Sequence, residues 1–146
     1  MTLVDANVLL YAVNADADHH EDSRAWLDAA LGGADTVGFA WIVVVAFVRL
    51  ATHPSLFPAP LSGDEALDRV DAWLAQPPAT IVEPGPGHVG VVRELLRSVG
   101  AGANLVNDAH LAAIALGHKA SVVSYDGDFA RFPGLASASP TDLRSR

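Results

Sequence analysis

Apolar and polar positions along the chain form short segments that predict strands and helices in turn. Apolar runs rich in β-branched residues favour strands, and apolar positions that recur every three or four residues favour helices. The predicted strands are 2–5, 36–39, 79–83 and 120–125. The predicted helices are 6–13, 18–31, 40–53, 62–74, 87–100 and 105–118. Because helices come in pairs between successive strands, we expect an α/β fold with a central parallel sheet flanked by helices on both faces.

Helix-end signals support these limits, although one segment is ambiguous. Asp18 is expected to cap the second helix. Ser62, followed three residues later by Glu65, is a capping-box signature for the fourth helix. The valines of segment 40–53 favour a strand, whereas its length favours a buried helix. Residues 101–104 are expected to form a loop between the last two helices.

Composition limits the class of protein. With 146 residues, of which 51% are hydrophobic, the chain has the usual size of one domain, here 1–146. The absence of cysteine excludes disulfides, thiolate zinc sites and a cysteine nucleophile, and it permits a reducing compartment. The longest apolar run, 39–48, is too short to span a bilayer, and the sequence begins without a basic leader. We therefore expect a cytoplasmic protein that makes no membrane contact.

The charge of the chain is strongly acidic, with a formal net charge of −8 and an isoelectric point near 4.9. A simple nucleic-acid binder normally shows a basic face, so this charge argues against one. An acidic surplus fits two other roles better. It can hold a divalent cation, or it can attract a basic protein partner.

Four aspartates are candidates for a metal site. Asp5 ends the first predicted strand, Asp126 and Asp128 follow the last one, and Asp108 lies in the first turn of a helix. Parallel strands bring their carboxyl ends to one edge of a sheet, where ligands bind. Crowded carboxylates raise each other's pKa and are tolerated mainly when a cation offsets their charge, and oxygen ligands suit Mg²⁺ or Mn²⁺. Two such ions can activate a water and stabilise the leaving oxygen of a phosphodiester. The alternative for Asp126-Gly-Asp128 is a purely structural role in an ordinary turn.

Three segments of the chain, "LVDANVLLYAVN", "NLVNDAHLAAIAL" and "VVSYDGDFARFPGL", resemble the signature blocks of the PIN domain, and specifically of the VapC toxins of VapBC toxin–antitoxin systems. The resemblance extends to "HEDSRAWLDAAL" and "FVRLATHP", and so covers nearly the whole chain. It implies a compact Rossmann-like fold in which 41–53 is a helix. It also implies an Mg²⁺-dependent endoribonuclease, with Mn²⁺ as a substitute, that cleaves structured RNA such as tRNA or rRNA. The implied partners are a VapB-type antitoxin and a second copy of the chain in a homodimer.

The resemblance also assigns residues to roles. Asp5, Asp108 and Asp126 match the catalytic, metal-binding acids of the family, and Asp128 matches a fourth, less regular ligand. Ala46 stands where many PIN domains have a glutamate, three residues before the arginine of "AFVR", which puts a second metal ion in doubt.

Three polar residues are candidates for contacts around the ligands or with RNA. Asn7 matches the polar residue two positions after the first acid, and its alternative role is a hydrogen bond at the helix N-terminus. Ser124 stands where the family often has threonine, so it either binds a water at the metal or ends the strand. Arg49 either contacts RNA or pairs with an internal acid.

Other interpretations stay open at this point. The histidines show no H-E-x-x-H pattern, which disfavours zinc. A phosphotransfer enzyme of the haloacid dehalogenase type would use Asp5 as nucleophile but needs an aspartate at position 7, where Asn7 stands. The third candidate is a catalytically weak PIN-like module that binds RNA or protein.

Overall fold

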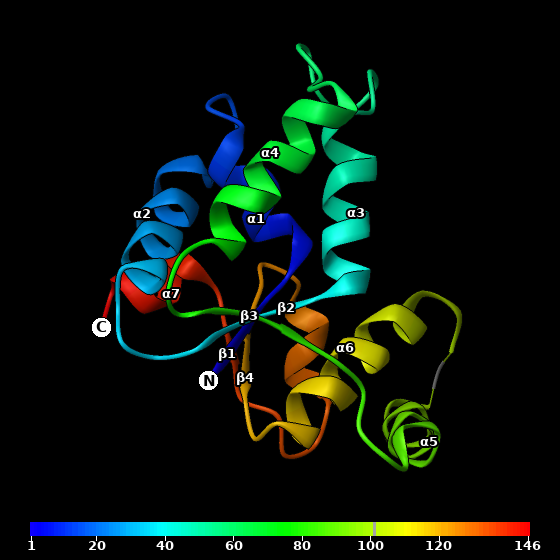
Figure 1. Cartoon of the computed structure of the whole chain (residues 1–146). Helices are drawn as coiled ribbons and strands as arrows, with labels where there is room; N and C mark the ends of the chain where they lie inside the picture. Colours follow the sequence, from blue (N-terminus) through cyan, green and yellow to red (C-terminus); the bar gives the residue numbers. More distant parts are fainter. Residues whose placement is uncertain (101) are drawn as a thin grey trace.

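Five parallel strands form one sheet in the order β3-β2-β1-β4-β5. This sheet lies at the centre of the molecule (Figure 1). The structure is a computed structural model that describes residues 1–100 and 102–146. The strands are β1 (Thr2–Val4), β2 (Val37–Ala40), β3 (Ala79–Val82), β4 (Ser121–Val123) and β5 (Ser137–Ala138). The α/β class and the parallel sheet expected from the sequence are confirmed.

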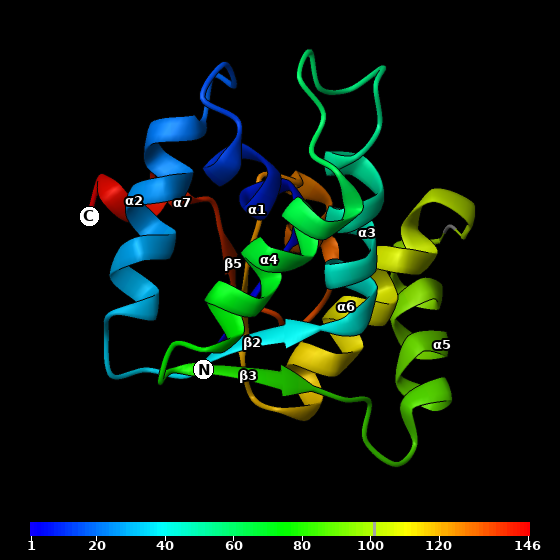
Figure 2. The ribbon, with the colours of Figure 1, turned by 45° about the horizontal axis from the view of Figure 1, so that its top comes forward.

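The helices lie on two sides of this sheet, as the order of the strands requires. The main helices are α1 (Ala6–Val13), α2 (His20–Leu31), α3 (Trp41–Ala51), α4 (Gly63–Leu74), α5 (His88–Val99) and α6 (Val106–Gly117). The chain builds outward from β1 to β2 and β3, then returns past β1 to add β4. Because crossovers between parallel strands are right-handed, this reversal places α5 and α6 on the face opposite α1–α4 (Figures 1 and 2).

The reversal of direction falls between β1 and β4, which are neighbours in register, with Val4 opposite Val123. In open α/β sheets such a switch point leaves a crevice outside the carboxyl ends of the two strands. The topology therefore predicts a ligand site beyond Val4 and Val123.

Apolar side chains from both helical layers pack on the sheet and hold it together. Leu3, Val4 and Phe39 are fully or almost fully buried, as expected for strands that are covered on both faces. A side chain at Gly38 would come within 3.0 Å of atoms of Leu3 and Val82, so a larger residue would push the packed neighbours apart. Helix α6 buries four alanines, whose small side chains let it approach the sheet closely.

Most helix predictions hold, with two differences at helix ends. The ambiguous segment is the helix α3, and it ends at Ala51. The capping box of Ser62 and Glu65 is present. The cap predicted at Asp18 is wrong, because His19 occupies the N-cap position of α2 and makes no capping hydrogen bond through its side chain.

Four short elements escaped the sequence prediction. They are β5, the 3-10 turns Ala103–Leu105 and Gly127–Arg131, and the C-terminal helix α7 (Pro140–Arg144). The loop predicted at 101–104 therefore ends in a 3-10 turn, and residue 101 lies outside the described residues. None of the helices in the described ranges combines the length and the apolar character needed to cross a membrane.

Candidate active site

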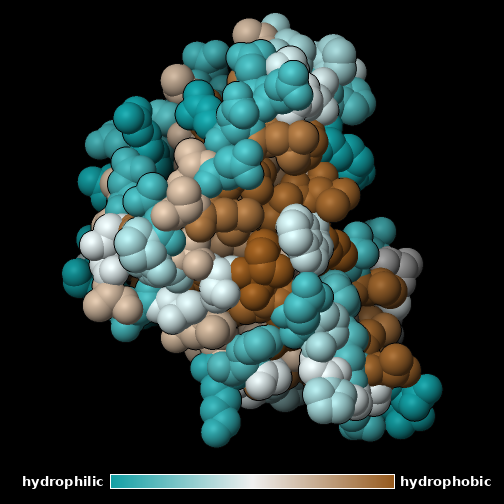
Figure 3. Space-filling model, viewed as in Figure 1, coloured by the Kyte–Doolittle hydropathy of each residue, from teal (hydrophilic) through white to brown (hydrophobic). Residues whose placement is uncertain are grey.

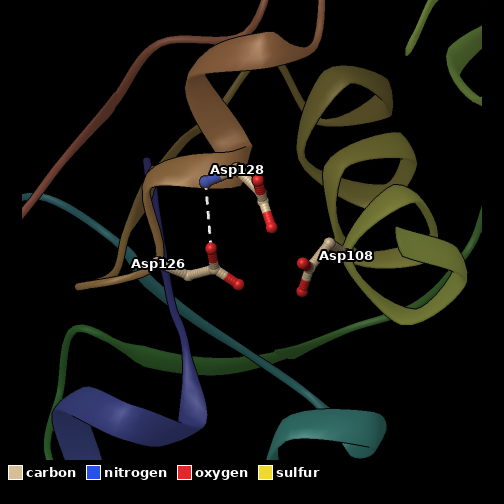
Figure 4. Close-up of side chains that lie close together, drawn as sticks. All are labelled: Asp108, Asp126 and Asp128. Carbon is tan, nitrogen blue, oxygen red and sulfur yellow. Dashed lines mark hydrogen bonds between the residues drawn. The ribbon is translucent and has the colours of Figure 1, made fainter. Parts of the chain in front are cut away.

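Three aspartates meet beyond the carboxyl ends of β1 and β4, where the topology predicts a ligand. Asp126 lies three residues after the end of β4, Asp128 lies in the 3-10 turn that follows it, and Asp108 lies in the first turn of α6. Each contributes a carboxylate oxygen to a group whose members all lie within 4.8 Å of one another. Figure 4 shows Asp108 reaching from α6 towards the other two side chains. Within 1–100 and 102–146, no other three side chains of His, Asp or Glu come as close.

The segment from Asp126 to Asp128 is an ordinary turn and is also part of the group of carboxylates. The backbone N–H of Asp128 donates to Asp126 Oδ1 at 2.9 Å, as expected when an aspartate opens a turn (Figure 4). The carboxylate of Asp126 nevertheless belongs to the group of three. Arg131 Nη1 lies 3.4 Å from Asp128 Oδ1, and both side chains are about half exposed, so this ion pair contributes little energy.

Asp5 lies beside this group and is held by hydrogen bonds of its own. It is the N-cap of α1, with Oδ1 accepting from the N–H of Ala6 at 2.7 Å. Its Oδ2 accepts from Ser124 Oγ at 2.7 Å and from Asn7 Nδ2 at 3.3 Å. Burial raises the pKa of Asp5, the bonds from Ser124 and Ala6 oppose this rise, and the charge of Asp126 adds to it.

Ser124 and Asn7 connect the end of β4 to the start of α1. Ser124 is 5% exposed, and its Oγ accepts from Asn7 Nδ2 at 3.0 Å and from the N–H of Asp126 at 2.9 Å. The other end of the Asn7 amide accepts from the N–H of Tyr125 at 3.1 Å. Asn7 therefore bonds across two elements and not only within its own helix. The two side chains fix the directions in which Asp5 and Asp126 leave their strands.

Electrostatic repulsion is concentrated at Asp108. Burial raises the pKa of Asp108 to about 7, with further contributions from its hydrogen bond with Asp126 and from the charges of Asp126, Asp5 and Asp128. Near neutral pH the group is therefore stabilised by retaining a proton or by binding a cation. Since every converging ligand atom is a carboxylate oxygen, the site suits a hard divalent cation.

Ala46 and Arg49, the other two positions discussed from the sequence, lie on α3. Ala46 is half-buried and packs against the apolar core, and as an alanine it offers no carboxylate to the site. Arg49 is exposed, and among the described residues it makes no ion pair, so the predicted pair with an internal acid is not formed. His88 Nε2 lies 2.8 Å from His110 Nδ1 and joins α5 to α6.

Aromatic residues next to the site were missed by sequence reasoning. Tyr125 stands between Ser124 and Asp126, and its ring packs against those of Tyr11 and His19. The position of Tyr125 between two site residues was a usable signal. Its ring partners are not visible in the sequence, because they come from segments more than 100 residues away.

Known proteins resemble this chain in sequence and in fold. The PIN domain family matches residues 2–135. Ribonuclease VapC37 of Mycobacterium tuberculosis is 56% identical over 143 residues, which cover 98% of this chain and 99% of that protein. Ribonuclease VapC31 of the same species is 41% identical, with coverage of 96% and 99%. A similar solved fold is that of VapBC2 from Rickettsia felis bound to a DNA fragment from their promoter, with a TM-score of 0.68, 18% identity and coverage of 94% and 97%.

Proposed function

Because the chain belongs to the PIN-domain family and, within it, to the VapC ribonucleases, we propose that it is the toxin of a type II toxin–antitoxin pair and an endoribonuclease. Its substrate is structured RNA, either tRNA or rRNA. The observation that carries this proposal is the convergence of Asp108, Asp126 and Asp128 within 4.8 Å, beside Asp5. Acting on these RNAs places the protein in the cytoplasm.

The cofactor we propose is Mg²⁺, with Mn²⁺ as a substitute. Asp108, Asp126 and Asp128 would hold the ion, and Asp5 would add a fourth carboxylate next to them. When bound, the ion supplies a nucleophilic water and stabilises the charge on the leaving oxygen of the phosphodiester. Mg²⁺ usually keeps several waters, so these carboxylates suffice for one ion. Because position 46 is an alanine, α3 offers no carboxylate that could hold a second ion.

The residues around the carboxylates keep them oriented for this chemistry. Asp108, with a pKa of about 7, releases its proton as a cation takes its place. Ser124 and Asn7 donate to Asp5 Oδ2 and so hold its carboxylate in one orientation. At the position where a phosphotransfer enzyme of the haloacid dehalogenase type needs a second aspartate, Asn7 instead donates to Asp5 Oδ2 and Ser124 Oγ, which disfavours that enzyme class.

The partner we propose is a VapB-type antitoxin that inserts a basic segment, with an arginine, against Asp5 and Asp126. The net charge of −8 and the crowded carboxylates attract such a segment. Homodimer formation stays a prediction. It is supported by apolar side chains that gather over α3 and α4, and separately over α5, in Figure 3. Exposed large apolar residues on these three helices are Trp41, Val45, Leu67 and Val89.

Incubation of the purified protein with total RNA, with Mg²⁺ or with a chelator, tests the proposed activity. We expect discrete cleavage products with Mg²⁺ and none with the chelator, and sequencing of the new ends identifies the cut position. RNA that stays intact in both samples, yet is bound, would instead support the catalytically weak binding module. Hydrolysis of p-nitrophenyl phosphate without RNA cleavage would support a phosphatase.

A further inference from the structure

A cluster of three aromatic rings is built on Tyr125, the residue that precedes Asp126 in the chain, and its rings make no hydrogen bond to the four aspartates. The rings of His19 and Tyr125 are stacked, with centroids 4.0 Å apart and an angle of 12° between their planes. Tyr11 packs edge-on against Tyr125 at 5.5 Å and tilted against His19 at 5.7 Å. The three residues come from α1, from the residue before α2, and from the segment after β4.

Two connections place this cluster at the active site. Tyr125 is the residue between Ser124 and Asp126, and its N–H donates to Asn7 Oδ1. Tyr11 lies four residues after Asn7 in α1, so the two side chains share one face of the helix. The rings therefore stand on the same residues that orient Asp5 and Asp126.

Hydrogen bonds hold the Tyr125 end of the cluster, and the His19 end is exposed to solvent. The hydroxyl of Tyr125 lies 2.8 Å from Thr141 Oγ1, which in turn donates to Asp22 Oδ2 at 2.6 Å. Tyr11 and Tyr125 are half-buried, whereas His19 is exposed. One face of the His19 ring is covered by Tyr125, and the side chain still presents surface to solvent.

We propose that His19, supported by Tyr125 and Tyr11, is a stacking surface for an unpaired nucleobase of the RNA substrate close to the cleaved bond. Proteins that recognise single-stranded RNA stack bases on aromatic and histidine rings, and this contact needs no positive charge. Such a contact matters here because the chain carries a net charge of −8 and its site is a group of carboxylates. The inference rests on the proposed ribonuclease function.

A structural role of His19 makes a different prediction from a stacking role. If the ring only covers Tyr125, any apolar side chain of similar size serves equally well. His19→Leu keeps such a cover but removes the flat ring, and His19→Trp keeps a flat ring. His53→Leu is the matched control, because His53 is also exposed and lies two residues beyond the end of α3, outside the cluster of rings.

The test measures kcat and KM on a short oligonucleotide that spans the cut position found in total RNA. We expect His19→Leu to raise KM by roughly 5- to 150-fold, the loss measured for one stacked base, with a smaller change in kcat. His19→Trp should restore the wild-type KM, and His53→Leu should leave it unchanged. A series of oligonucleotides with one abasic position each then locates the stacked base. The wild type should bind one of them more weakly than the rest, and His19→Leu should bind all of them equally.

Three results would overturn the inference while the function stands. The first is wild-type cleavage together with an unchanged KM in His19→Leu. The second is a KM that rises equally in the Leu and Trp variants, which indicates a structural role. The third is weaker binding of a VapB-type antitoxin to His19→Leu with KM unchanged, which assigns the rings to the protein partner. If the wild type does not cleave RNA at all, the proposed function fails and the inference fails with it.

Discussion

Ser124 Oγ donates a hydrogen bond of 2.7 Å to Asp5 Oδ2, and this bond joins the ends of β4 and β1 where the strand order reverses. Ser124 Oγ in turn accepts hydrogen bonds from Asn7 Nδ2 and from the N–H of Asp126. A single buried hydroxyl thus sets the geometry of two carboxylates that come from distant parts of the sequence. The switch point brings the ends of β1 and β4 together, and Ser124 orients the carboxylates there.

Replacing Ser124 by alanine should destabilise the protein and impair cleavage. A buried carboxylate that loses a donor costs about 1–3 kcal/mol in the free energy of unfolding. The pKa of Asp5 should rise further, because Ser124 opposes the rise caused by burial. Denaturant unfolding and cleavage rates measure both effects. Ser121→Ala is the control, since Ser121 lies on the same strand and contacts Thr2 at the far end from the carboxylates. Equal losses in the two variants would refute the specific role of Ser124.

The stability of the metal-free protein should fall as the pH rises from about 4 to about 7. The pKa of Asp108 is raised to about 7 in the folded state, against about 3.9 in an unfolded chain, so the folded state binds the extra proton in this window. Its stabilising contribution is complete below about pH 4 and is lost as the pH passes 7. Because Asp108 is only half-buried, solvent screening reduces the effect to on the order of 1–2 kcal/mol. Thermal unfolding across this pH range measures it.

Two controls isolate Asp108 as the source of this pH dependence. Asp108→Asn should flatten the curve, and saturating Mn²⁺ should remove the fall in the wild type, because bound cation stabilises the ionised form. A difference between the wild-type and Asp108→Asn curves that rises between about pH 4 and 7 would have the wrong sign for a carboxyl group whose pKa is raised.

Ala46→Glu tests the family acid that this chain lacks. If the new side chain reaches the carboxylates, Mn²⁺ binds more tightly and the metal-free protein loses stability through like-charge repulsion. Calorimetric titration and thermal unfolding with and without Mn²⁺ should show both effects together. Val45→Glu is the control, because Val45 is the preceding residue and is 62% exposed. Destabilisation that Mn²⁺ does not reverse, with unchanged affinity, would mean that the glutamate enters the core instead.

Antitoxin binding should depend on the charge of the site. Neutralising Asp5 and Asp126 together, by substitution with asparagine, should weaken the binding of a VapB-type antitoxin by at least tenfold, since charged pairs at interfaces contribute about 1.5 kcal/mol or more. The double variant Asp64→Asn and Asp68→Asn removes the same charge from exposed positions on α4 and should bind normally. Equal affinities for the two double variants, measured by calorimetry, would exclude blockade by charge at the active site.

The sequence was sufficient for those parts of the fold and site that depend on local pattern. The apolar pattern predicted the alternation of strands and helices. The places of Asp5, Asp108 and Asp126 were predictable because each acid follows a predicted strand or begins a predicted helix. The bond between Ser124 and Asp5 was not predictable, because it depends on β1 and β4 being neighbours although they are over 100 residues apart. Very short elements such as β5 carry too few residues to show a period.

The start of α2 shows how tertiary contacts override a local signal. Asp18 has a good capping side chain, yet the helix begins at His20. His19 stacks on Tyr125, and His20 bonds to the carbonyl oxygen of Tyr11. These contacts fix both residues against distant segments, so the helix starts one residue later than a cap at Asp18 would allow.

The most direct test of the account is the rate of RNA cleavage by the wild type and by Asp108→Asn at saturating Mg²⁺, with Glu94→Gln as control. Glu94 is an exposed acid on α5 that pairs with Arg97 away from the three aspartates. Mutating a residue that only hydrogen-bonds to a metal ligand typically lowers metal affinity or activity by roughly 10- to 100-fold. Loss of a ligand itself should therefore lower the cleavage rate by at least about 100-fold. The account predicts this loss in Asp108→Asn, a folded protein in both variants, and wild-type rates in Glu94→Gln. Cleavage by Asp108→Asn at the wild-type rate would contradict it.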